Sequence, residues 1–592
     1  MPESLIPRPQ AEDSHKDLDL AFDWGDDPSF WFTVTRQSTG DVIFTSKGTH
    51  LVYEDQFVEF VNTLPEDYNL YGLGERIHGL RLNNNFTATI YAADVGDPID
   101  RNIYGSHPFY LETRYFPTGG NGTKKSLTQA ELEKADYGYG NGPNSGYPTN
   151  GKGSGFESYS HGVYLRNLHG MDVVLKPTNL TWRSLGGSID LFFFDGPTQP
   201  EVTKQYQNSA IGLPAMQQYW TFGYHQCRWG YRNWTELREV VETLRNFSIP
   251  METIWLDIDY MDQYRDFTLD PVTFSPSGVA DFFGWLHGNN QHFVPIVDAA
   301  IYIPNPTNAS DAYDTYTRGN ESDVFLKNPD GSQYIGAVWP GYTVFPDWLS
   351  ANGVSWWVKE MVEWYKEVSC DERNNNSAAN LAQVPFSGFW VDMTEVSSFC
   401  VGSCGTGNVT LNPVHPPFSL PGEVGNVIYD FPEGFNITNA TEAASASAAS
   451  ASQAAAASAT AASSVSAEYL RTTPTPGVRN VNHPPYVIDN VQGDIAVHAV
   501  SPNATHQNGV VEYDVHNVWG HQIINATYQG LLQVFEGKRP FIIGRSTFAG
   551  SGKWAGHWGG DNASKWYYMY FSIPQALSFS LFGIPMFGVD TW

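Results

Sequence analysis

The sequence predicts an α/β protein in which an N-terminal antiparallel β-sandwich precedes a (β/α)8 barrel that stops before its eighth strand. The chain has 592 residues, of which 41% are hydrophobic, so it is long and apolar enough to form two or three packed units. Short segments of alternating polarity fill the first third, and longer apolar segments then alternate with helical patterns. The first pattern indicates antiparallel sheets, and the second indicates a parallel sheet covered by helices.

Residues 1–205 are predicted to form the β-sandwich domain. Residues 30–35 and 42–45 alternate between apolar and polar side chains, and the turn-forming sequence S-T-G-D lies between them. Residues 119–155 are rich in Gly, Asn, Tyr and Lys, so we expect a long loop there.

Residues 206–592 are predicted to form the catalytic barrel. Residues 219–226 indicate a buried strand, and residues 234–246 indicate a helix, because four apolar side chains of that segment fall on one helical face. Further apolar strands are expected at residues 253–258, 292–297, 389–393, 541–544 and 585–589. Strands that alternate with helices over this length favour a TIM barrel.

Two long segments interrupt the barrel pattern, at about residues 302–352 and 402–505. The second contains residues 443–467, which are almost entirely Ala and Ser. No amphipathic face emerges in this tract, so we expect a solvated, disordered, low-complexity loop.

Charge excludes several classes of partner. The 33 Lys and Arg residues against 63 Asp and Glu give a formal net charge of −30, which disfavours nucleic acid and anionic membrane surfaces. No apolar run is long enough to span a bilayer, and no signal peptide is visible at the N-terminus.

Glycosylation signals in the sequence indicate export from the cell. Fourteen N-x-Ser/Thr sequons favour a secreted, extracellular or cell-wall glycoprotein whose signal peptide is not in this chain, although a few sequons arise by chance in any Asn-rich sequence.

Four cysteines are too few for a disulfide scaffold. Cys400 and Cys404 enclose three residues and are predicted to close a tight loop as a disulfide in an oxidising compartment. The pair is a weak metal site because no His or second Cys pair accompanies it. Cys227 and Cys370 are expected to be buried thiols. We expect neither a metal nor a cofactor.

Acidic residues follow several predicted strands. They are Asp257 and Asp259, Asp298, Asp392 and Glu395, Asp561, and Asp590. One such Asp could simply cap a helix, but a set at successive strand ends predicts an active site, because the carboxyl ends of barrel strands meet on one face. Trp, Tyr or His residues lie near each position. Carboxylates with aromatic residues and without metal ligands fit glycoside hydrolysis, which needs one protonated and one ionised carboxyl group.

Several motifs resemble those of glycoside hydrolase family 31, and in particular the secreted fungal α-glucosidases of that family. The similarity runs from about residue 27 to residue 590. The motifs are L-Y-G-L-G-E at 70–75, Y-G-S-H-P-F-Y at 104–110, C-R-W-G-Y at 227–231, D-I-D-Y-M-D at 257–262, W-V-D-M-T-E at 390–395, R-S-T-F-A-G at 545–550, G-H-W-G-G-D at 556–561 and the terminal F-G-V-D.

The resemblance implies a role for each matching residue. Asp392 would be the nucleophile that forms a covalent glucosyl intermediate, Asp561 the acid and then the base, and Glu395 would belong to the same catalytic group. Asp257 and Arg545 would hold sugar hydroxyls, and Asp259 could share or exchange the role of Asp257. The other substrate-contacting residues would be Asp94, Trp229, Ile258, Trp339, Trp390, Met393, Phe399, His557, Trp558 and Asp590.

The chain also departs from the family pattern. The usual W-N-R-D context of Asp94 reads Y-A-A-D, and the motif that ends at Asp590 usually continues. An eighth strand and further C-terminal domains are therefore expected elsewhere, and a second polypeptide could supply them.

The function implied by the resemblance is that of a retaining exo-α-glucosidase. It would act on α-1,4-linked glucose at the non-reducing ends of maltose, malto-oligosaccharides and starch, with transglucosylation as a further activity. An α-xylosidase and a glycan-trimming glucosidase of the secretory pathway are the alternatives within this class. A non-catalytic carbohydrate-binding subunit is the alternative from another class.

Overall fold

The structure is a computed structural model of the whole chain. It describes residues 3, 5–9, 18–96, 98–117, 125–128, 131, 156–369, 386–399, 403, 480–482 and 484–590. The predicted loop at 119–155 falls largely outside these residues. The Ala/Ser tract at 443–467 and the four positions Cys370, Cys400, Cys404 and Trp592 lie wholly outside them.

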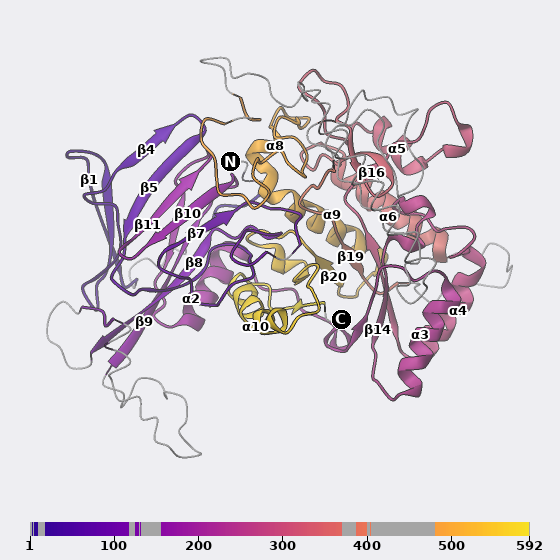
Figure 1. Cartoon of the computed structure of the whole chain (residues 1–592), viewed down its shortest axis with the longest axis horizontal. Helices are drawn as coiled ribbons and strands as arrows, with labels where there is room; N and C mark the ends of the chain where they lie inside the picture. Colours follow the sequence, from indigo (N-terminus) through magenta and orange to yellow (C-terminus); the bar gives the residue numbers. More distant parts are fainter. Residues whose placement is uncertain are drawn as a thin grey trace.

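The N-terminal domain consists of three antiparallel sheets (Figure 1). Their order is β1-β2-β3, β4-β5-β11-β10-β7 and β12-β9-β8-β6. The strands are β1 Leu20–Gly25, β2 Trp31–Arg36, β3 Asp41–Thr45, β4 Leu51–Glu54, β5 Phe57–Thr63, β6 Asn69–Gly72, β7 Phe86–Ile90, β8 Phe109–Pro117, β9 Phe156–Leu165, β10 Met171–Lys176, β11 Asn179–Ser184 and β12 Leu191–Phe194. The predicted antiparallel architecture is therefore confirmed, whereas the proposed domain boundary at residue 205 stays a prediction.

One buried core joins the two larger sheets of this domain. Phe60 and Trp182 of one sheet pack in the same apolar cluster as Tyr110 and Val163 of the other. The alternation of apolar and polar residues produces this core, because successive side chains of a strand point to opposite faces of its sheet.

A seven-stranded parallel sheet forms the centre of the second half of the chain, in the order β13-β14-β15-β19-β20-β21-β22. The strands are β13 His225–Gln226, β14 Thr253–Leu256, β15 His292–Val297, β19 Phe389–Val391, β20 Ile542–Gly544, β21 Gly556–Trp558 and β22 Phe587–Gly588. The strands follow chain order, as in a curled TIM-like barrel. This confirms the predicted fold class, with seven parallel strands in the part of the chain that the structure describes.

The predicted strand at residues 219–226 is wrong over most of its length. Tyr219–Phe222 forms a short 3-10 helix, and the side chain of Tyr219 is 94% exposed. Pairing with β14 begins only at His225. Apolar residues alone do not distinguish an exposed turn at the edge of a sheet from a strand inside it. Strand β21 was not predicted, because Gly556, His557 and Trp558 do not form an apolar run.

Helices cover the parallel sheet (Figure 1). The helix expected at 234–246 is confirmed as α3 Trp234–Asn246, which Asn233 caps by accepting a hydrogen bond from the Glu236 N–H. Helix α2 Gln199–Tyr206 packs instead on β9 of the N-terminal domain. The other helices are α4 Pro276–Gly288, α5 Asp314–Glu321, α6 Gly353–Ser369, α8 Glu512–Val515, α9 Trp519–Val534 and α10 Trp566–Leu581. Within the predicted insertion at 302–352, β17 Gly336–Val338 and β18 Gly341–Val344 form a small antiparallel sheet with β16 Ile301–Tyr302.

The two halves of the chain share a second apolar core. Phe109 and Tyr164 of the N-terminal domain pack in one cluster with Val515, Phe548 and Phe579 of the second half. In Figure 1, helix α10 (yellow) lies between the N-terminal sheets and the parallel sheet. This contact sets the position of N-terminal loops relative to the barrel strands.

Candidate active site

The carboxyl ends of the parallel strands gather the predicted acidic residues. Asp257 directly follows β14, Asp392 follows β19, and Arg545 follows β20. The Asp392 N–H donates to the Val297 carbonyl at the end of β15, 3.1 Å away. Because neighbouring parallel strands end at the same edge, residues almost 300 positions apart in the sequence reach one place.

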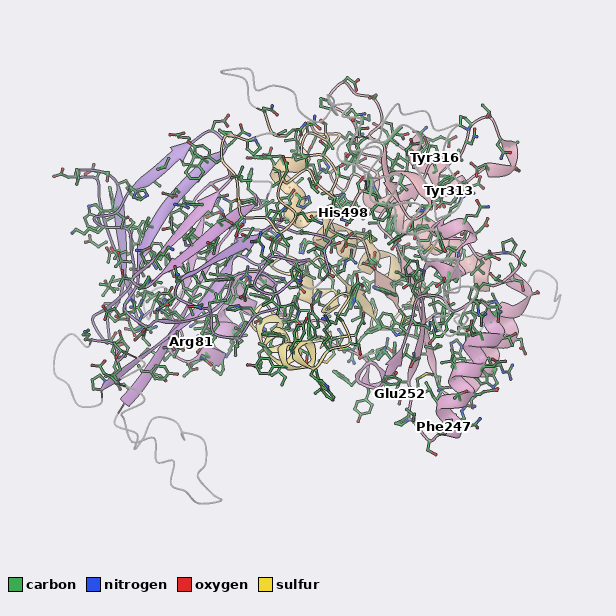
Figure 2. All side chains as sticks on the ribbon, viewed as in Figure 1. Arg81, Phe247, Glu252, Tyr313, Tyr316 and His498 are labelled. Carbon is green, nitrogen blue, oxygen red and sulfur yellow. The ribbon has the colours of Figure 1, made fainter. Side chains whose placement is uncertain are left out.

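Figure 2 helps to locate this edge. Glu252, which precedes β14, lies at the lower end of the sheet, as does Phe247. His498 lies nearer the centre of the molecule, toward the N-terminal domain. The site therefore occupies the end of the sheet that faces away from Glu252.

Arg545 connects three carboxylates. Its Nη1 lies 2.8 Å from Asp392 Oδ1, and its Nη2 lies 2.7 Å from Glu395 Oε2 and 3.1 Å from Asp94 Oδ1. Its Nε also donates to both oxygens of Glu395, at 3.0 and 3.1 Å. The Arg545 side chain is 2% exposed, so these charge-assisted hydrogen bonds lie away from bulk water. Such bonds are stronger in the protein interior than in water.

The backbone turns sharply after Asp392. Met393 adopts the left-handed conformation with φ 56°, which is uncommon for a residue other than glycine and is typical of functional sites. The turn directs the Met393 N–H to Asp392 Oδ1, 2.6 Å away. One oxygen of Asp392 therefore accepts from the backbone and from Arg545.

The two carboxyl groups predicted to perform catalysis lie in different surroundings. Burial raises the pKa of Asp392 to about 7, and the charges of Asp561 and Glu395 add to the rise, whereas Arg545 opposes it. Burial also raises the pKa of Asp561, with Arg545 opposing and Asp94 adding to the effect. The side chain of Asp561 is exposed, so water weakens this rise.

The two groups repel each other's charge, so they titrate as a pair. Arg545 and the Met393 N–H both touch Asp392. Both contacts favour its ionised form and oppose the rise in pKa that burial causes. The arrangement therefore brings two carboxyl groups whose proton binding is linked to the same edge of the sheet.

Asp257 and Asp259 face different partners. Asp257 Oδ1 accepts from the Ile258 N–H at 2.7 Å, and burial together with the charges of Asp259, Asp392 and Asp561 raises the pKa of Asp257. Asp259 Oδ2 accepts from the Gly230 N–H at 2.7 Å, and burial raises the pKa of Asp259 to about 6. The carboxyl group of Asp257 is thus the one whose pKa responds to the charges of Asp392 and Asp561.

Asp298 forms a buried pair with Asp266. The Asp298 N–H donates to Asp266 Oδ1 at 2.9 Å, and both residues are at most 3% exposed. Burial raises the pKa of both carboxyl groups. The charges of Asp392 and Asp257 contribute to the rise at Asp298, so this pair lies behind the site.

The predicted aromatic residues form two groups. The ring centroids of Trp229 and Trp339 are 5.6 Å apart, and those of Trp339 and Phe399 are 4.9 Å apart. Trp390 and Trp558 form the second group, with centroids 5.4 Å apart. These rings provide apolar surfaces of the kind on which sugar faces pack. Ile258 and Met393 are only 2% and 3% exposed, so they support the site from beneath.

His557 lies inside the protein rather than on an open surface. Its Nδ1 lies 2.9 Å from the Gly544 carbonyl and its Nε2 lies 2.8 Å from Glu75 Oε1. Its ring stacks on Phe579 with centroids 4.0 Å apart, and the residue is fully buried. Both ring nitrogens already have partners, so direct contact between His557 and substrate stays a prediction.

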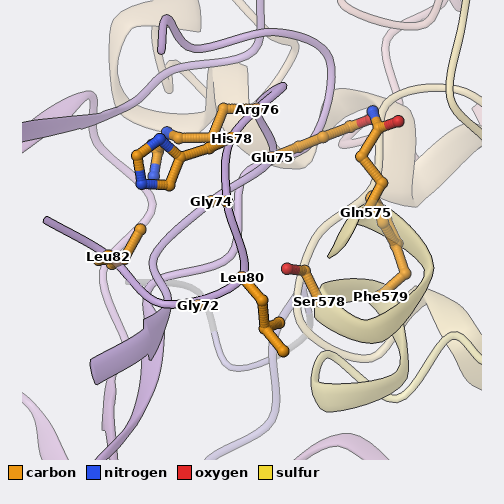
Figure 3. A pocket seen from close by; sticks show the side chains of 11 residues that line it. Gly72, Gly74, Glu75, Arg76, His78, Leu80, Leu82, Gln575, Ser578 and Phe579 are labelled. Atoms are coloured by element: carbon orange, nitrogen blue, oxygen red, sulfur yellow. The ribbon is translucent and has the colours of Figure 1, made fainter. Parts of the chain in front are cut away.

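Glu75 contacts His557 and also lines a small pocket at the contact between the two halves of the chain (Figure 3). The pocket lies between the Gly72–Leu82 segment and helix α10, from which Gln575, Ser578 and Phe579 line it. Its lining includes none of the residues predicted to contact substrate. It is therefore separate from the strand-end site.

Asp94 reaches the site as the resemblance implies, and it brings neighbours that sequence reasoning missed. The Asp94 carbonyl accepts from Gln492 Nε2 at 2.6 Å, and His498 Nδ1 lies 3.6 Å from Asp94 Oδ2. The ring of His498 stacks on Phe399 with centroids 5.5 Å apart. Gln492 and His498 belong to the long predicted insertion, where no motif marked them.

Asp590 lies two residues after β22, near the end of the described chain, and its side chain is exposed. Burial and the charge of Asp561 raise its pKa to about 7. The predicted Cys400–Cys404 disulfide lies outside the described residues, and Cys227 is a half-buried free thiol.

The described part of the chain offers neither a metal-binding cluster nor a membrane-spanning helix. No group of three or more His, Cys, Asp or Glu residues there could hold a metal ion. Among the same residues, no helix has both the length and the apolar character to cross a bilayer.

Known proteins of one family match almost the whole chain. Residues 214–591 match the TIM-barrel domain of glycosyl hydrolases family 31, and residues 14–119 match the galactose mutarotase-like N-terminal domain of the same family. An α-glucosidase of Aspergillus oryzae is 60% identical over 100% of this chain and 56% of its own length. Glucoamylase 1 of Candida albicans is 50% identical over 100% of this chain and 57% of its own length. The chain thus spans little more than half the length of these relatives.

A solved structure shares the fold at low sequence identity. The α subunit of glucosidase II in its DNJ-bound form superposes with a TM-score of 0.62 at 20% identity, covering 95% of this chain and 50% of that one. The strand-end carboxylates, the parallel sheet and the match over residues 214–591 agree. The chain belongs to glycoside hydrolase family 31.

Proposed function

We propose that this chain carries the catalytic site of a retaining exo-α-glucosidase. It would release glucose from the non-reducing ends of maltose, malto-oligosaccharides and starch, with transglucosylation as a side reaction. The observation that supports this most is the pairing of Asp392 with Arg545 at 2.8 Å, beside a second carboxyl group, Asp561, whose pKa is raised. Relatives of 60% identity that are named α-glucosidases point to the same activity.

The proposed reaction has two displacements. In the first, a carboxylate oxygen of Asp392 attacks C1 of the terminal glucose, the bond from C1 to the glycosidic oxygen breaks, and Asp561 gives its proton to that oxygen. In the second, Asp561 takes a proton from water, the water oxygen attacks C1, and the ester bond to Asp392 breaks. Two inversions give net retention, so the first product is α-glucose.

The other residues have supporting roles in this proposal. Arg545 holds Asp392 and Glu395 and keeps Asp392 ionised. Asp257 and Asp94 would accept hydrogen bonds from sugar hydroxyls. Trp229, Trp339 and Phe399, together with Trp390 and Trp558, would pack on the apolar faces of the sugar rings.

Release of glucose from maltose tests the activity. We expect the wild-type protein to give α-glucose first and Asp392→Ala to lose at least about a thousandfold in kcat, because the nucleophile is removed. Asp330→Ala, in an exposed turn, is the matched control and should retain activity. Equal rates for Asp392→Ala and wild type, or β-glucose as the first product, would end the proposal. Xylosyl and glucosyl nitrophenyl substrates separate it from an α-xylosidase.

Azide tests the nucleophile itself. With Asp392→Gly and 4-nitrophenyl α-glucoside, azide fits the space left by the carboxylate and should form a β-glucosyl azide. This product does not require Asp561 as an acid, because nitrophenolate leaves without protonation. Absence of any glucosyl azide would contradict the assignment of Asp392.

We also infer that the protein is secreted as a glycoprotein. Asn85 and Asn308 carry sequons on exposed side chains, whereas the Asn562 sequon beside Asp561 is 4% exposed. Peptide mass spectrometry of protein from the native host should find glycans at the two exposed sites and none at Asn562.

We propose in addition that further polypeptide, in the same chain or in a second one, packs against helix α10. One stripe of this helix is apolar and open to solvent: Trp566, Met569, Tyr570, Ile573 and Leu577 are 83%, 60%, 64%, 63% and 47% exposed. Their spacing of three or four places them on one helical face, and an exposed patch of this kind favours a protein partner. Intact mass and cross-linking of the purified active protein test this directly.

A further inference from the structure

One segment of the N-terminal domain lies directly against the loops that carry the catalytic residues. The Ser106 N–H donates to the Thr547 carbonyl at 2.8 Å, and His107 Nε2 lies 2.8 Å from Thr547 Oγ1. Thr547 follows β20, two residues after Arg545. The segment is therefore fixed against the end of a barrel strand by main-chain and side-chain bonds.

Tyr104, at the start of this segment, touches both halves of the catalytic arrangement. The guanidinium carbon of Arg545 lies 4.8 Å from the centroid of the Tyr104 ring. The Asp561 N–H donates to the Tyr104 hydroxyl oxygen at 3.4 Å. Arg545 holds Asp392, so a single side chain lies between the group that holds the proposed nucleophile and the backbone of the proposed acid.

Gly560 shows how closely the ring supports the loop of Asp561. Gly560 has φ +78°, and a Cβ at this position would lie 2.1 Å from Cε2 of the Tyr104 ring. The ring therefore occupies the space beside the Gly560 backbone, and the loop cannot move toward it. Ile77 and Ile103 pack with the ring in one apolar cluster.

We infer that Tyr104 is a positioning residue that fixes Asp561 relative to the Arg545–Asp392 pair. This inference rests on the proposed function. Tyr104 is fully buried, so it acts through its contacts with Arg545, Gly560 and Asp561 and not by touching substrate. Because proton transfer depends on the placement of the acid to within a fraction of an ångström, a loosened loop slows the step that needs the acid.

Tyr104→Phe is the sharpest variant, since it removes only the hydroxyl group that accepts from the Asp561 N–H. We expect kcat for maltose to fall about tenfold, and kcat for 4-nitrophenyl α-glucoside to fall less than about threefold, because nitrophenolate leaves with little help from an acid. KM should change little. The alkaline limb of the pH profile should move, whereas the acidic limb should stay.

Tyr110→Phe is the matched control. Tyr110 is also fully buried, and its hydroxyl also accepts a 3.4 Å bond, from Asn62 Nδ2 within the N-terminal domain. This substitution also removes one tyrosine hydroxyl group from the N-terminal domain, but at a position that does not contact the site. A merely structural effect would lower the thermal stability of both variants and leave the ratio of maltose to nitrophenyl rates unchanged.

Hydrogen exchange gives a readout that does not depend on activity. The peptide that contains the Asp561 amide should exchange faster in Tyr104→Phe than in wild type or Tyr110→Phe. If exchange rises and the wild-type protein does not hydrolyse maltose, the positioning contact stands and the proposed function falls. If the wild type is active and Tyr104→Phe matches Tyr110→Phe in rate ratio and in exchange, the inference is overturned and the proposed function stands.

Discussion

At the scale of single residues, Arg545 determines how charge is distributed in the site. It is 2% exposed and contacts Asp392, Glu395 and Asp94. A buried cation with three carboxylate neighbours divides its stabilisation among them. Glu395 thus raises the pKa of Asp392, while Asp94 raises the pKa of Asp561, and the two neighbours act on different members of the proposed catalytic pair.

Because of this division, we expect two isosteric variants to shift opposite limbs of the pH profile of activity. Glu395→Gln removes a negative charge beside Asp392 and lowers its pKa, so the acidic limb of kcat/KM should move to lower pH. Asp94→Asn lowers the pKa of Asp561, so the alkaline limb should move to lower pH. Each variant should also lose about tenfold in kcat/KM, because Arg545 loses one of its partners.

Complete pH profiles on maltose test the assignment, with each variant serving as the control for the other. Movement of the same limb in both variants would contradict the assignment of Asp392 as the base form and Asp561 as the acid form.

At the scale of elements, close packing behind the strand ends fixes where the catalytic loops can lie. The turn at Ser551–Lys553, which links β20 to β21, packs on the residue that follows helix α10 by two positions. A Cβ on Gly552 would lie 1.9 Å from the Gly583 carbonyl oxygen. The contact is between backbone groups, so no change of side-chain conformation relieves it.

Gly552→Ala should therefore destabilise the protein by about 1–3 kcal/mol, as overpacking of a core does. Gly288→Ala is the control: Gly288 is the last residue of α4, and a Cβ there meets nothing within 4 Å. It should be neutral or slightly stabilising, since alanine favours helix. Thermal or denaturant unfolding of the two variants measures the difference, and equal stabilities would contradict the packing argument.

At the scale of the whole molecule, buried carboxyl groups make folding dependent on pH. Burial raises the pKa of Asp259 to about 6 and of Asp392 to about 7, and it raises those of Asp257, Asp266 and Asp298 in the same direction. In this range the folded state binds more protons than the unfolded state, so stability falls as pH rises. The formal net charge of −30 at pH 7 acts in the same direction through self-repulsion.

Two other buried groups, His506 and Glu112, affect stability at the alkaline and the acidic end of the pH scale. Hydrogen bonds with Asp347 and Glu512 outweigh burial and raise the pKa of His506 to about 9, so its contribution is complete below pH 6.5 and is lost as pH rises toward 9. Arg114 lowers the pKa of Glu112 to about 2. Its contribution is present above about pH 4.5 and is lost as pH falls toward 2.

We therefore expect the highest Tm near pH 5 and a continuous decline from pH 5 to pH 9. His506→Gln should cost more stability at pH 5 than at pH 9, because the imidazole is fully charged at pH 5 and only about half charged at pH 9. Calorimetry across this range checks both expectations. A Tm that rises from pH 5 to pH 8 would contradict the role of the buried acids.

The sequence by itself determined the local order of this protein. Periodicity predicted α3 to the residue, and apolar runs located β15 and, within a few positions, β14, β19, β20 and β22. Asp and Glu after those runs predicted the site, because parallel strands must end at a common edge. Strand β21 was missed because Gly556, His557 and Trp558 do not form an apolar run, and the exposed turn at Tyr219–Phe222 contains the same residue types as a strand.

Only the tertiary structure decided which side chains complete the site. Tyr104 and Glu75 reach Asp561 and His557 across more than 400 residues of sequence. His557 belongs to a motif that resembles a substrate-contacting one, yet burial between Gly544 and Glu75 turns both of its nitrogens inward. These outcomes depend on how two separately folded sheets pack against each other, and no periodicity within one segment encodes that contact.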